Sequence, residues 1–410
     1  MTHVRYTADM SEHVQKHRWW KLAAKICGST LFGLVLLEVG LRITGLCPLP
    51  AAPDAALSQL PIQEMVELAA AESWIHKPLE TEVREADGNR PQIVAKRNWC
   101  SCREDADTPV EKPPGTYRVV VLGDSHTDGF VENGDSYANV LEGLLLQPAD
   151  VMNCGQAVSS PYQQLWIYRA LYQRFQPDLL VVGFYAGNDL LDLMLQHDRI
   201  HLERVGDRYV HAGPTWRPDL TREQSPLKAA LLRHSAICRA AAQLHWLQVD
   251  QQRKDRSADY YDLLVQANDL YRGATWQGLN QAYYFKHHPH EWSNVSSMFE
   301  YVLTQFAESA PRDGMIVVVI PTLRQFHPER FQAAERLLQL TPEDSACDDR
   351  ACDLALELCR KLQIPAIDMR PIFKSHEGEL YWDGDQHINV DAHRLIAEAL
   401  AEQIAQKHKP

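Results

Sequence analysis

The sequence predicts an α/β domain that is built on a parallel sheet. Runs of β-branched and other apolar residues recur along the chain, most clearly at 116–122, 178–184 and 315–320. Such continuous apolar runs are typical of strands that are buried on both faces of a parallel sheet. Segments with the apolar spacing of helices alternate with these runs, and this alternation predicts helices on both faces of the sheet.

The individual elements follow from the same patterns. The expected strands are, in chain order, residues 116–122, 150–153, 178–184, 315–320 and 364–368. Helices are expected within 129–142, at 161–175 and at 392–406, where Asn389 or Asp391 is placed to cap the last one. Between the third and fourth strands, residues 190–312 form a long, mostly helical insertion, which we expect to cover the carboxyl edge of the sheet.

The chain of 410 residues is long enough for a large core, and its composition excludes some functions. A formal net charge of −13 argues against a nucleic-acid-binding protein, which needs a basic surface. Nine cysteines include no C-x-x-C pair, so no structural zinc site is indicated, and we expect no metal or cofactor. Cys347 and Cys352 are spaced for a local disulfide in an exported domain, and Cys100 and Cys102 are weaker candidates.

An apolar stretch near the N-terminus predicts a membrane anchor. Residues 1–21 are polar and carry basic side chains, and residues 22–46 are largely apolar. The uncharged centre, 26–37, is short for a spanning helix of about 20 residues. A span over 23–42 leaves its charges near the ends, and Glu38 stands four residues before Arg42, the spacing of a helical ion pair.

We expect an uncleaved, single-pass anchor in the inner (cytoplasmic) membrane of a bacterium. The basic end would lie inside, so that everything after Leu46 faces the periplasm or the cell exterior. A cleaved signal peptide and a buried core helix are the alternatives. Residues 47–115 begin as a Pro/Ala-rich linker and continue as an irregular appendage, in which the sequence reveals no chemistry. The main domain is expected over 116–410.

Four short polar blocks fall at or beside the ends of predicted strands. They are Gly123-Asp124-Ser125, Asn153-Cys154-Gly155, Gly187-Asn188-Asp189 and the segment 382–389, which contains Asp383, Asp385 and His387. Because parallel strands share one carboxyl edge, these blocks are expected to converge there. Taken alone, Ser125 is nearly as good a helix cap as a nucleophile, so the other blocks decide its role.

Together the blocks resemble those of the SGNH (GDSL-type) hydrolases, and more narrowly of their membrane-anchored bacterial members. The serine, glycine, asparagine and histidine of that family correspond in order to Ser125, Gly155, Asn188 and His387, and the resemblance covers 116–406. It implies a flavodoxin-like three-layer α/β/α sandwich. It also implies hydrolysis of esters in lipids, small molecules or acylated carbohydrates.

The residue chemistry agrees with this resemblance. A serine hydroxyl needs a base to take its proton, and His387 has a reference pKa suited to that task near neutral pH. Asp385, two residues before His387, can orient the imidazole. Many relatives place this aspartate three residues before the histidine, where this chain has Gly384, and Asp383 is therefore a minor alternative. The resemblance assigns the oxyanion donors to the backbone N–H groups of Ser125 and Gly155 and to the Asn188 side chain.

The expected function is that of a serine esterase that forms an acyl-enzyme. The O-acyl groups of an envelope or secreted polysaccharide are one expected substrate. An O-acyltransferase with the same site is the first alternative, because sequence does not reveal how the 190–312 insertion excludes water. A catalytically silent carbohydrate-binding or assembly protein is the second.

Overall fold

The computed structural model describes residues 29–30, 32–41, 59–195, 200–205, 208–212, 234–238, 240–241, 262–273, 275–384 and 386–407. These residues fall into two compact units, one within 52–214 and 253–410 and the other within 1–51 and 215–252. The larger unit contains the parallel sheet and all the described residues of the predicted site.

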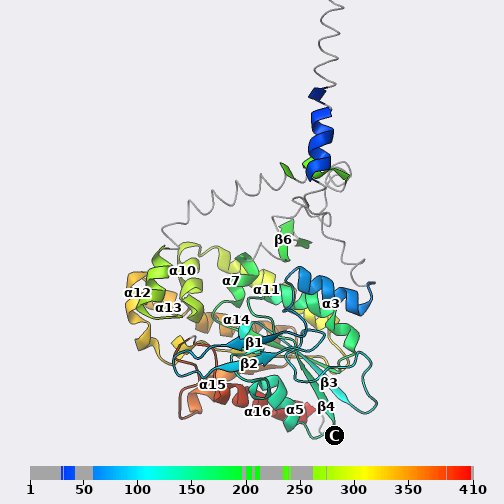
Figure 1. The fold of residues 1–410 in the computed structure, drawn as a ribbon. Coiled ribbons are helices and arrows are strands. Elements are labelled where there is room, and N and C mark those ends of the chain that lie inside the picture. The colour runs from blue at the N-terminus through cyan, green and yellow to red at the C-terminus, as the bar shows by residue number, and fades with distance from the viewer. Residues whose placement is uncertain are drawn as a thin grey trace, which may run out of the picture. The chain divides into compact units, whose positions relative to one another are not determined.

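A five-stranded parallel sheet forms the centre of the larger unit (Figure 1). In chain order its strands are β3 (Tyr117–Leu122), β4 (Ala149–Asn153), β5 (Leu179–Tyr185), β8 (Met315–Ile320) and β9 (Ala366–Asp368). Their spatial order is β4-β3-β5-β8-β9, and each neighbouring pair is parallel. The chain moves from β3 to β4 on one side and then to β5 on the other. The topological switch therefore lies between β3 and β5, where sheets of this kind bind ligands.

The predicted strands are all present, and their ends lie within two residues of the predicted ones. β3, β5 and β8 are buried at every position, as expected for apolar runs covered on both faces. Alternate side chains of β3 point to opposite faces, so Val120 and Leu122 pack in one core while Val119 and Val121 pack in the other. The parallel α/β class is thus confirmed.

Helices cover both faces of this sheet. On the Val120 side lie α6 (Pro161–Ala170), α7 (Asp189–Leu195), α11 (Glu291–Ser309) and α14 (Cys347–Lys361). On the Val119 side lie α5 (Tyr137–Leu144), α15 (Met369–Ser375) and α16 (Val390–Lys407). The predicted C-terminal helix corresponds to α16. The predicted helix 161–175 divides into α6 and the 3-10 turn η2 (Tyr172–Phe175).

Short helices and turns make the remaining connections of the larger unit. They are α4 (Ser125–Asp128), η1 (Asn133–Asp135), η3 (Thr275–Leu279), α10 (Asn280–His287), η4 (Leu323–Gln325), η5 (Pro328–Arg330), α12 (Gln332–Leu337) and α13 (Pro342–Ser345).

The segment between β5 and β8 differs in part from the expected helical insertion. After α7 it forms an antiparallel hairpin of β6 (His201–Val205) and β7 (Arg208–Ala212). Its last helix, α11, stacks Phe299 on Phe184 of β5, with ring centroids 4.8 Å apart. α11 is therefore the crossover helix that leads into β8 and packs on one face of the sheet. The part that reaches the carboxyl edge is the stretch 262–273 with η3.

The appendage has regular structure. It contains α3 (Ile62–Ala71) and an antiparallel hairpin of β1 (Thr81–Arg84) and β2 (Ile93–Lys96). Helix α3 buries Met65 and Val66 in the same core as α6 and α11. The appendage is therefore packed on the domain as part of its core rather than attached as an irregular tether.

The smaller unit includes part of the predicted anchor. Residues 32–41 are helical and expose Phe32 and Leu36, whereas most of the expected 22–46 span, Arg42 included, lies outside the described residues. Within the described residues, the helices are too short or too polar to cross a bilayer. The Glu38 carboxylate accepts hydrogen bonds from the backbone N–H groups of Ala236 and Ile237, at 2.8 and 3.0 Å.

The predicted local disulfides do not form. Cys347 and Cys352 are both buried on α14 with free thiols, and five residues along a helix turn their side chains to different sides. Cys100 and Cys102 are also free thiols, with sulfur atoms 3.6 Å apart. Close sequence spacing alone was therefore a poor guide to pairing.

Candidate active site

Ser125 is the first residue of a short helix at the carboxyl end of β3. The Asp124 carboxylate caps this helix by accepting a hydrogen bond of 2.9 Å from the His126 N–H. Helix α4 packs tightly on the sheet, because a Cβ atom at Gly183 of β5 would lie 2.5 Å from Thr127 Oγ1. The Thr127 hydroxyl is also hydrogen-bonded to Tyr137. The turn is capped by Asp124 and packed against Gly183, and these contacts fix the position of the Ser125 hydroxyl.

His387 contacts Ser125 directly. Its Nε2 atom lies 2.9 Å from Ser125 Oγ, within the range of a hydrogen bond. The histidine lies in a tight turn: the Trp382 N–H donates to the His387 carbonyl at 2.9 Å, and an isolated bridge pairs Tyr381 with Ile388. Two residues 262 positions apart are thus brought together in the geometry of a nucleophile and its base.

The predicted acid of the triad, Asp385, lies outside the described residues. Its rival Asp383 is described, and its side chain is exposed. The backbone N–H of Asp383 donates to Asn89 Oδ1 at 2.8 Å, in the appendage. An exposed carboxylate is a poor match for a triad acid, which works from a buried position against the imidazole.

Aromatic rings hold the imidazole of His387 from both sides. Phe130 stacks on it with ring centroids 3.9 Å apart, and His126 lies at 4.8 Å. His126 in turn stacks on Tyr185 at 3.7 Å and is itself buried. Burial, followed by repulsion from His387, lowers the pKa of His126 well below its ordinary value. The base therefore works beside an imidazole that stays neutral at physiological pH.

Ser125 and His387 face a cavity of about 330 Å³ at the carboxyl edge of the sheet. Phe130, Val158 and Tyr185 give it apolar walls, and Asn268 and Arg272 from the stretch 262–273 also line it. A larger hollow of about 840 Å³ lies around Phe326 and α15 and contains none of the predicted catalytic residues. The smaller cavity is therefore the candidate active site, because it contains Ser125 and His387.

Asn188 lines the same cavity as Ser125. Its Nδ2 atom donates a hydrogen bond of 2.8 Å to Asp192 Oδ2. An amide nitrogen carries two hydrogens, so the carboxylate orients the group and leaves its second N–H for another acceptor. Asn188 lies in the cavity with Ser125, and its role as an oxyanion donor stays a prediction.

Gly155 has a different position from the predicted one. It does not line the cavity, and its N–H donates to Asn153 Oδ1 at 3.1 Å. A Cβ atom at Gly155 would lie 2.7 Å from Thr127 C and 2.9 Å from Asp128 Cα. The structure therefore requires a glycine here so that the nucleophile turn can pack against this loop.

Buried carboxyl groups surround the nucleophile turn. Burial raises the pKa of Asp124 to about 7, and burial, followed by the nearby Asp124, raises the pKa of Asp189 well above its usual range. Asp189 Oδ2 accepts a hydrogen bond of 2.8 Å from the Tyr185 N–H. These two groups therefore hold protons to higher pH than exposed aspartates do, which limits negative charge near the serine.

Sequence reasoning missed several of the residues at this site. Phe130 lies five residues after the serine, and the order of the motifs gave no reason to place it on His387. Val158 lines the cavity with a φ of 60°, in a region that a β-branched residue rarely adopts. Asn268 and Arg272 come from the insertion, whose sequence lacks any motif. Val158 is also exposed, and its unusual φ is a local feature that the sequence does not reveal.

We predict that Gly155→Ala destabilises the protein by about 1–3 kcal/mol, because the new methyl group meets backbone atoms that cannot move aside cheaply. Urea denaturation measures the change. Gly143→Ala on α5 is the matched control, since nothing lies within 4 Å of its Cβ position and alanine favours a helix. An alanine at 155 that is as well tolerated as one at 143 would contradict the packing described here.

Comparison with known proteins gives similarity at the level of fold. No family model and no curated protein matches the chain. Similar solved structures include a lipase/acylhydrolase from Enterococcus faecalis, a lipolytic G-D-S-L family protein from Veillonella parvula and the acetyl xylan esterase AlAXEase. They are 14%, 10% and 9% identical to this chain and cover 72%, 71% and 70% of it. The matches include 98%, 99% and 99% of their own lengths, with TM-scores of 0.33, 0.35 and 0.35.

These neighbours are hydrolases of the kind that the four sequence blocks resemble. Their identities and TM-scores are too low to transfer any one activity to this chain. The functional assignment below therefore rests on the contacts within the site.

Proposed function

We propose that the protein is a serine esterase that works through an acyl-enzyme. The observation that carries this proposal is the contact of 2.9 Å between Ser125 Oγ and His387 Nε2, two residues that line the same cavity. A serine that only capped a helix would have no need of an imidazole in this position.

The reaction would proceed in two steps. His387 Nε2 takes the proton of Ser125 as Oγ attacks the ester carbonyl, and the same proton then passes to the departing alcohol. A water molecule next gives a proton to His387 and attacks the acyl-serine, which releases the acid and restores Ser125. Asp385 is proposed to orient His387 through Nδ1. Phe130 stacks on the imidazole and keeps its Nε2 directed at Ser125 Oγ.

The negative charge on the carbonyl oxygen needs donors aimed at it. We propose the Ser125 N–H, at the start of α4, and the second N–H of the Asn188 amide. The Gly155 N–H would have to release Asn153 Oδ1 before it could serve as a third donor.

The cavity favours a short acyl group. Its volume of about 330 Å³ is shared between the acyl chain and the reacting ester, and Phe130, Val158 and Tyr185 offer an apolar wall. An acetyl or similarly small O-acyl group on an envelope or secreted polysaccharide is the proposed substrate. The N-terminal apolar segment is proposed to anchor the enzyme in the inner membrane with its catalytic domain on the periplasmic or extracellular side.

Replacing either member of the contact should abolish most of the activity. We expect Ser125→Ala and His387→Ala to lower kcat for p-nitrophenyl acetate by several orders of magnitude. A fluorophosphonate should label Ser125 in the wild-type protein. Ser297→Ala and His290→Ala change exposed residues on and beside α11 and serve as controls. A folded wild-type protein that neither hydrolyses nor labels is the silent protein of the second alternative.

The two aspartates of the histidine loop can be separated by mutation. We expect Asp385→Asn to lower kcat by orders of magnitude, because the imidazole loses the carboxylate that stabilises its protonated form. Asp383→Asn should change kcat little, since that side chain is exposed. Steady-state kinetics of the two variants decide between them, and a greater loss with Asp383→Asn would reverse the assignment.

The fate of the acyl group distinguishes an esterase from a transferase. We expect mass spectrometry of an acetylated oligosaccharide, incubated with enzyme and an unacylated acceptor, to show free acetate as the main product. p-Nitrophenyl esters should react more slowly as the acyl chain grows from acetate to octanoate, because the cavity is small. Acylated acceptor as the main product would instead identify an O-acyltransferase.

The proposed topology predicts where the chain is exported. A periplasmic reporter fused after Pro61 should be active only on the export side of the membrane, because the basic residues before 22 favour the cytoplasm. The same fusion lacking residues 22–46 is the control. A full-length fusion whose reporter stays inactive would rule the orientation out.

A further inference from the structure

The appendage, here residues 59–110, contacts each of the three loops that form the candidate site. One group of its side chains binds the nucleophile turn, a histidine binds the loop that follows β4, and a hairpin turn packs on the histidine loop. The appendage was expected to carry no chemistry, so these contacts call for an explanation.

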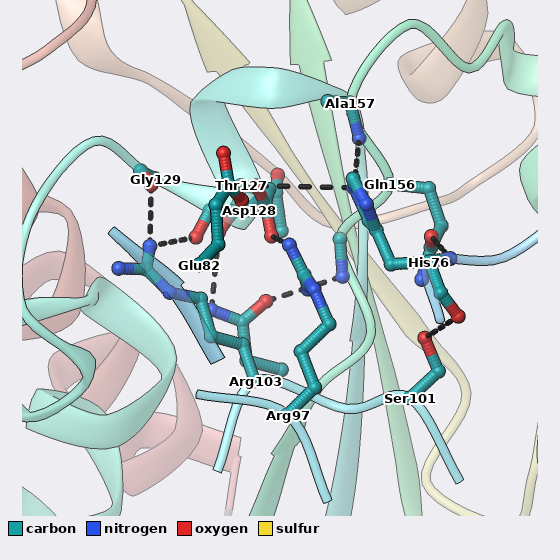
Figure 2. Close-up of polar contacts among 12 residues, drawn as sticks. His76, Glu82, Arg97, Ser101, Arg103, Thr127, Asp128, Gly129, Gln156 and Ala157 are labelled. Carbon is teal, nitrogen blue, oxygen red and sulfur yellow. Dashed lines mark hydrogen bonds and ion pairs between the residues drawn. The ribbon is translucent and has the colours of Figure 1, made fainter. Parts of the chain in front are cut away.

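The first contact is an ion pair at the end of the nucleophile helix. Asp128, the last residue of α4, is fully buried. Its Oδ1 accepts a hydrogen bond from Arg97 and its Oδ2 one from Arg84, both at 2.7 Å. Figure 2 shows Arg97 and Arg103 reaching this side of the turn from the appendage. Asp128 stands three positions after Ser125 on the same short helix, so a shift of the carboxylate moves the nucleophile.

The charges of this cluster are balanced for a buried site. Burial alone would raise the pKa of Asp128, but Arg97, Arg84 and Arg103 outweigh burial and lower that pKa below its usual range. Arg103 donates to the carbonyl groups of Asp128, Gly129 and Val131. Removing one arginine would leave uncompensated charge and free carbonyls where the chain leaves the nucleophile helix.

Arg84 links this cluster to the catalytic base. It donates to the Gly129 carbonyl at 2.7 Å, and its guanidinium group stacks on the Phe130 ring, 4.3 Å from the centroid. The same Phe130 ring also stacks on the imidazole of His387, with ring centroids 3.9 Å apart. One side chain of β1 thus supports both the turn that carries the serine and the ring that orients the imidazole.

His76 makes the second contact. Its Nε2 accepts a hydrogen bond of 3.3 Å from the Ala157 N–H, and its own backbone N–H donates to Gln156 at 2.7 Å. Figure 2 shows His76 between this loop and Ser101, whose hydroxyl donates to the His76 carbonyl. Burial lowers the pKa of His76 to about 4, against the attraction of Asp128, so the ring stays a neutral acceptor near neutral pH.

The third contact is a close approach of two backbones. Gly88 has a φ of 57°, and a Cβ atom there would lie 2.6 Å from the Gly384 N atom. The Asp383 N–H donates to Asn89 at 2.8 Å. The turn that leads from β1 to β2 therefore lies directly on the loop that presents His387.

We infer that the appendage is a positioning element of the active site and that Arg84 is its central positioning residue. It holds the Ser125 turn through Asp128 and Gly129, and it holds His387 through Phe130. This inference rests on the proposed esterase function.

The test compares Arg84→Met and Arg84→Lys with wild type. A misplacement of the reacting groups is costly, so we expect kcat for p-nitrophenyl acetate to fall roughly tenfold to a hundredfold in Arg84→Met, with KM little changed. Arg84→Lys keeps the charge and should therefore recover part of the kcat that Arg84→Met loses.

Arg118→Met is the matched control. Arg118 is a fully buried arginine at the other end of β3, where it pairs with Asp150 at 2.7 Å. Its loss should lower the melting temperature but leave kcat, per site labelled by fluorophosphonate, unchanged. Gly88→Ala offers a second route if Arg84→Met does not fold, and it should lower kcat by displacing the histidine loop.

The outcomes separate the two proposals. A wild-type protein without labelling or hydrolysis refutes the esterase. An active wild type with unchanged kcat in Arg84→Met, or in Gly88→Ala where that variant replaces it, refutes the positioning role and leaves the esterase intact.

A different observation carries a second inference about the same appendage. Cys102 and Cys154 are free thiols in this structure, but their sulfur atoms lie only 2.8 Å apart, and both residues are buried. The adjacent residues fix the two chains, because the Arg103 N–H donates to the Asn153 carbonyl at 2.8 Å. Cys100 Sγ is farther from Cys102, at 3.6 Å.

We propose that Cys102 and Cys154 form a disulfide when the protein folds in an oxidising compartment. Two thiols lose their protons and two electrons as the S–S bond forms, and a protein or small-molecule disulfide is the oxidant that is reduced to two thiols. The bond would join the appendage covalently to the end of β4, next to Gly155.

Peptide mapping tests this bond. The purified full chain, refolded with reduced and oxidised glutathione and alkylated without reduction, should yield a peptide that links Cys102 to Cys154. The link should persist in Cys352→Ser and disappear in Cys154→Ser. Alkylated thiols at both positions in the wild type, or a link between Cys100 and Cys102, would overturn the proposal.

Discussion

The buried carboxylate of Asp128 is the interaction on which the rest of the site depends. It ends the helix that begins with the nucleophile, and it draws Arg84 and Arg97 of the appendage into the interior. A lone buried carboxylate would be costly, and the arginines would be equally costly without it. Each is stable there only because the other is present. The position of Ser125 is thus tied to residues that precede the sheet in sequence.

The site itself is an assembly of loops, and no single element contains it. The serine follows β3, Asn188 follows β5, and His387 precedes α16, so the parallel sheet only brings their starting points to one edge. Within that edge, the fine placement comes from contacts between the loops. Asp192 orients the Asn188 amide, and Phe130 supports the imidazole. The charge near Ser125 also depends on two buried groups. Burial raises the pKa of Asp124, and it lowers the pKa of His126 so that this ring stays neutral near neutral pH.

A feature could be predicted from the sequence when residues close together in the chain determine it. The apolar runs identified β3, β5 and β8 because strands covered on both faces are apolar at every position. The pair of Ser125 and His387 was predicted because each stands in a short motif at a strand end or a loop. Gly155 was assigned a role by its motif alone, whereas its function is set by the backbone of Asp128 in another loop. Arg84, His76 and Phe130 belong to no motif, because their roles arise from contacts across long stretches of sequence.

The contact between Gly88 and Gly384 joins segments near opposite ends of the described domain, and this has a consequence for how the protein is made. Contacts between residues so distant in sequence carry a large loop-closure cost and tend to form late in folding. The appendage leaves the ribosome first and the histidine loop almost last. The chain therefore becomes competent only when its two ends have met, and incomplete chains carry an exposed serine without its base. In the proposed esterase, this topology would keep incomplete chains inactive during synthesis.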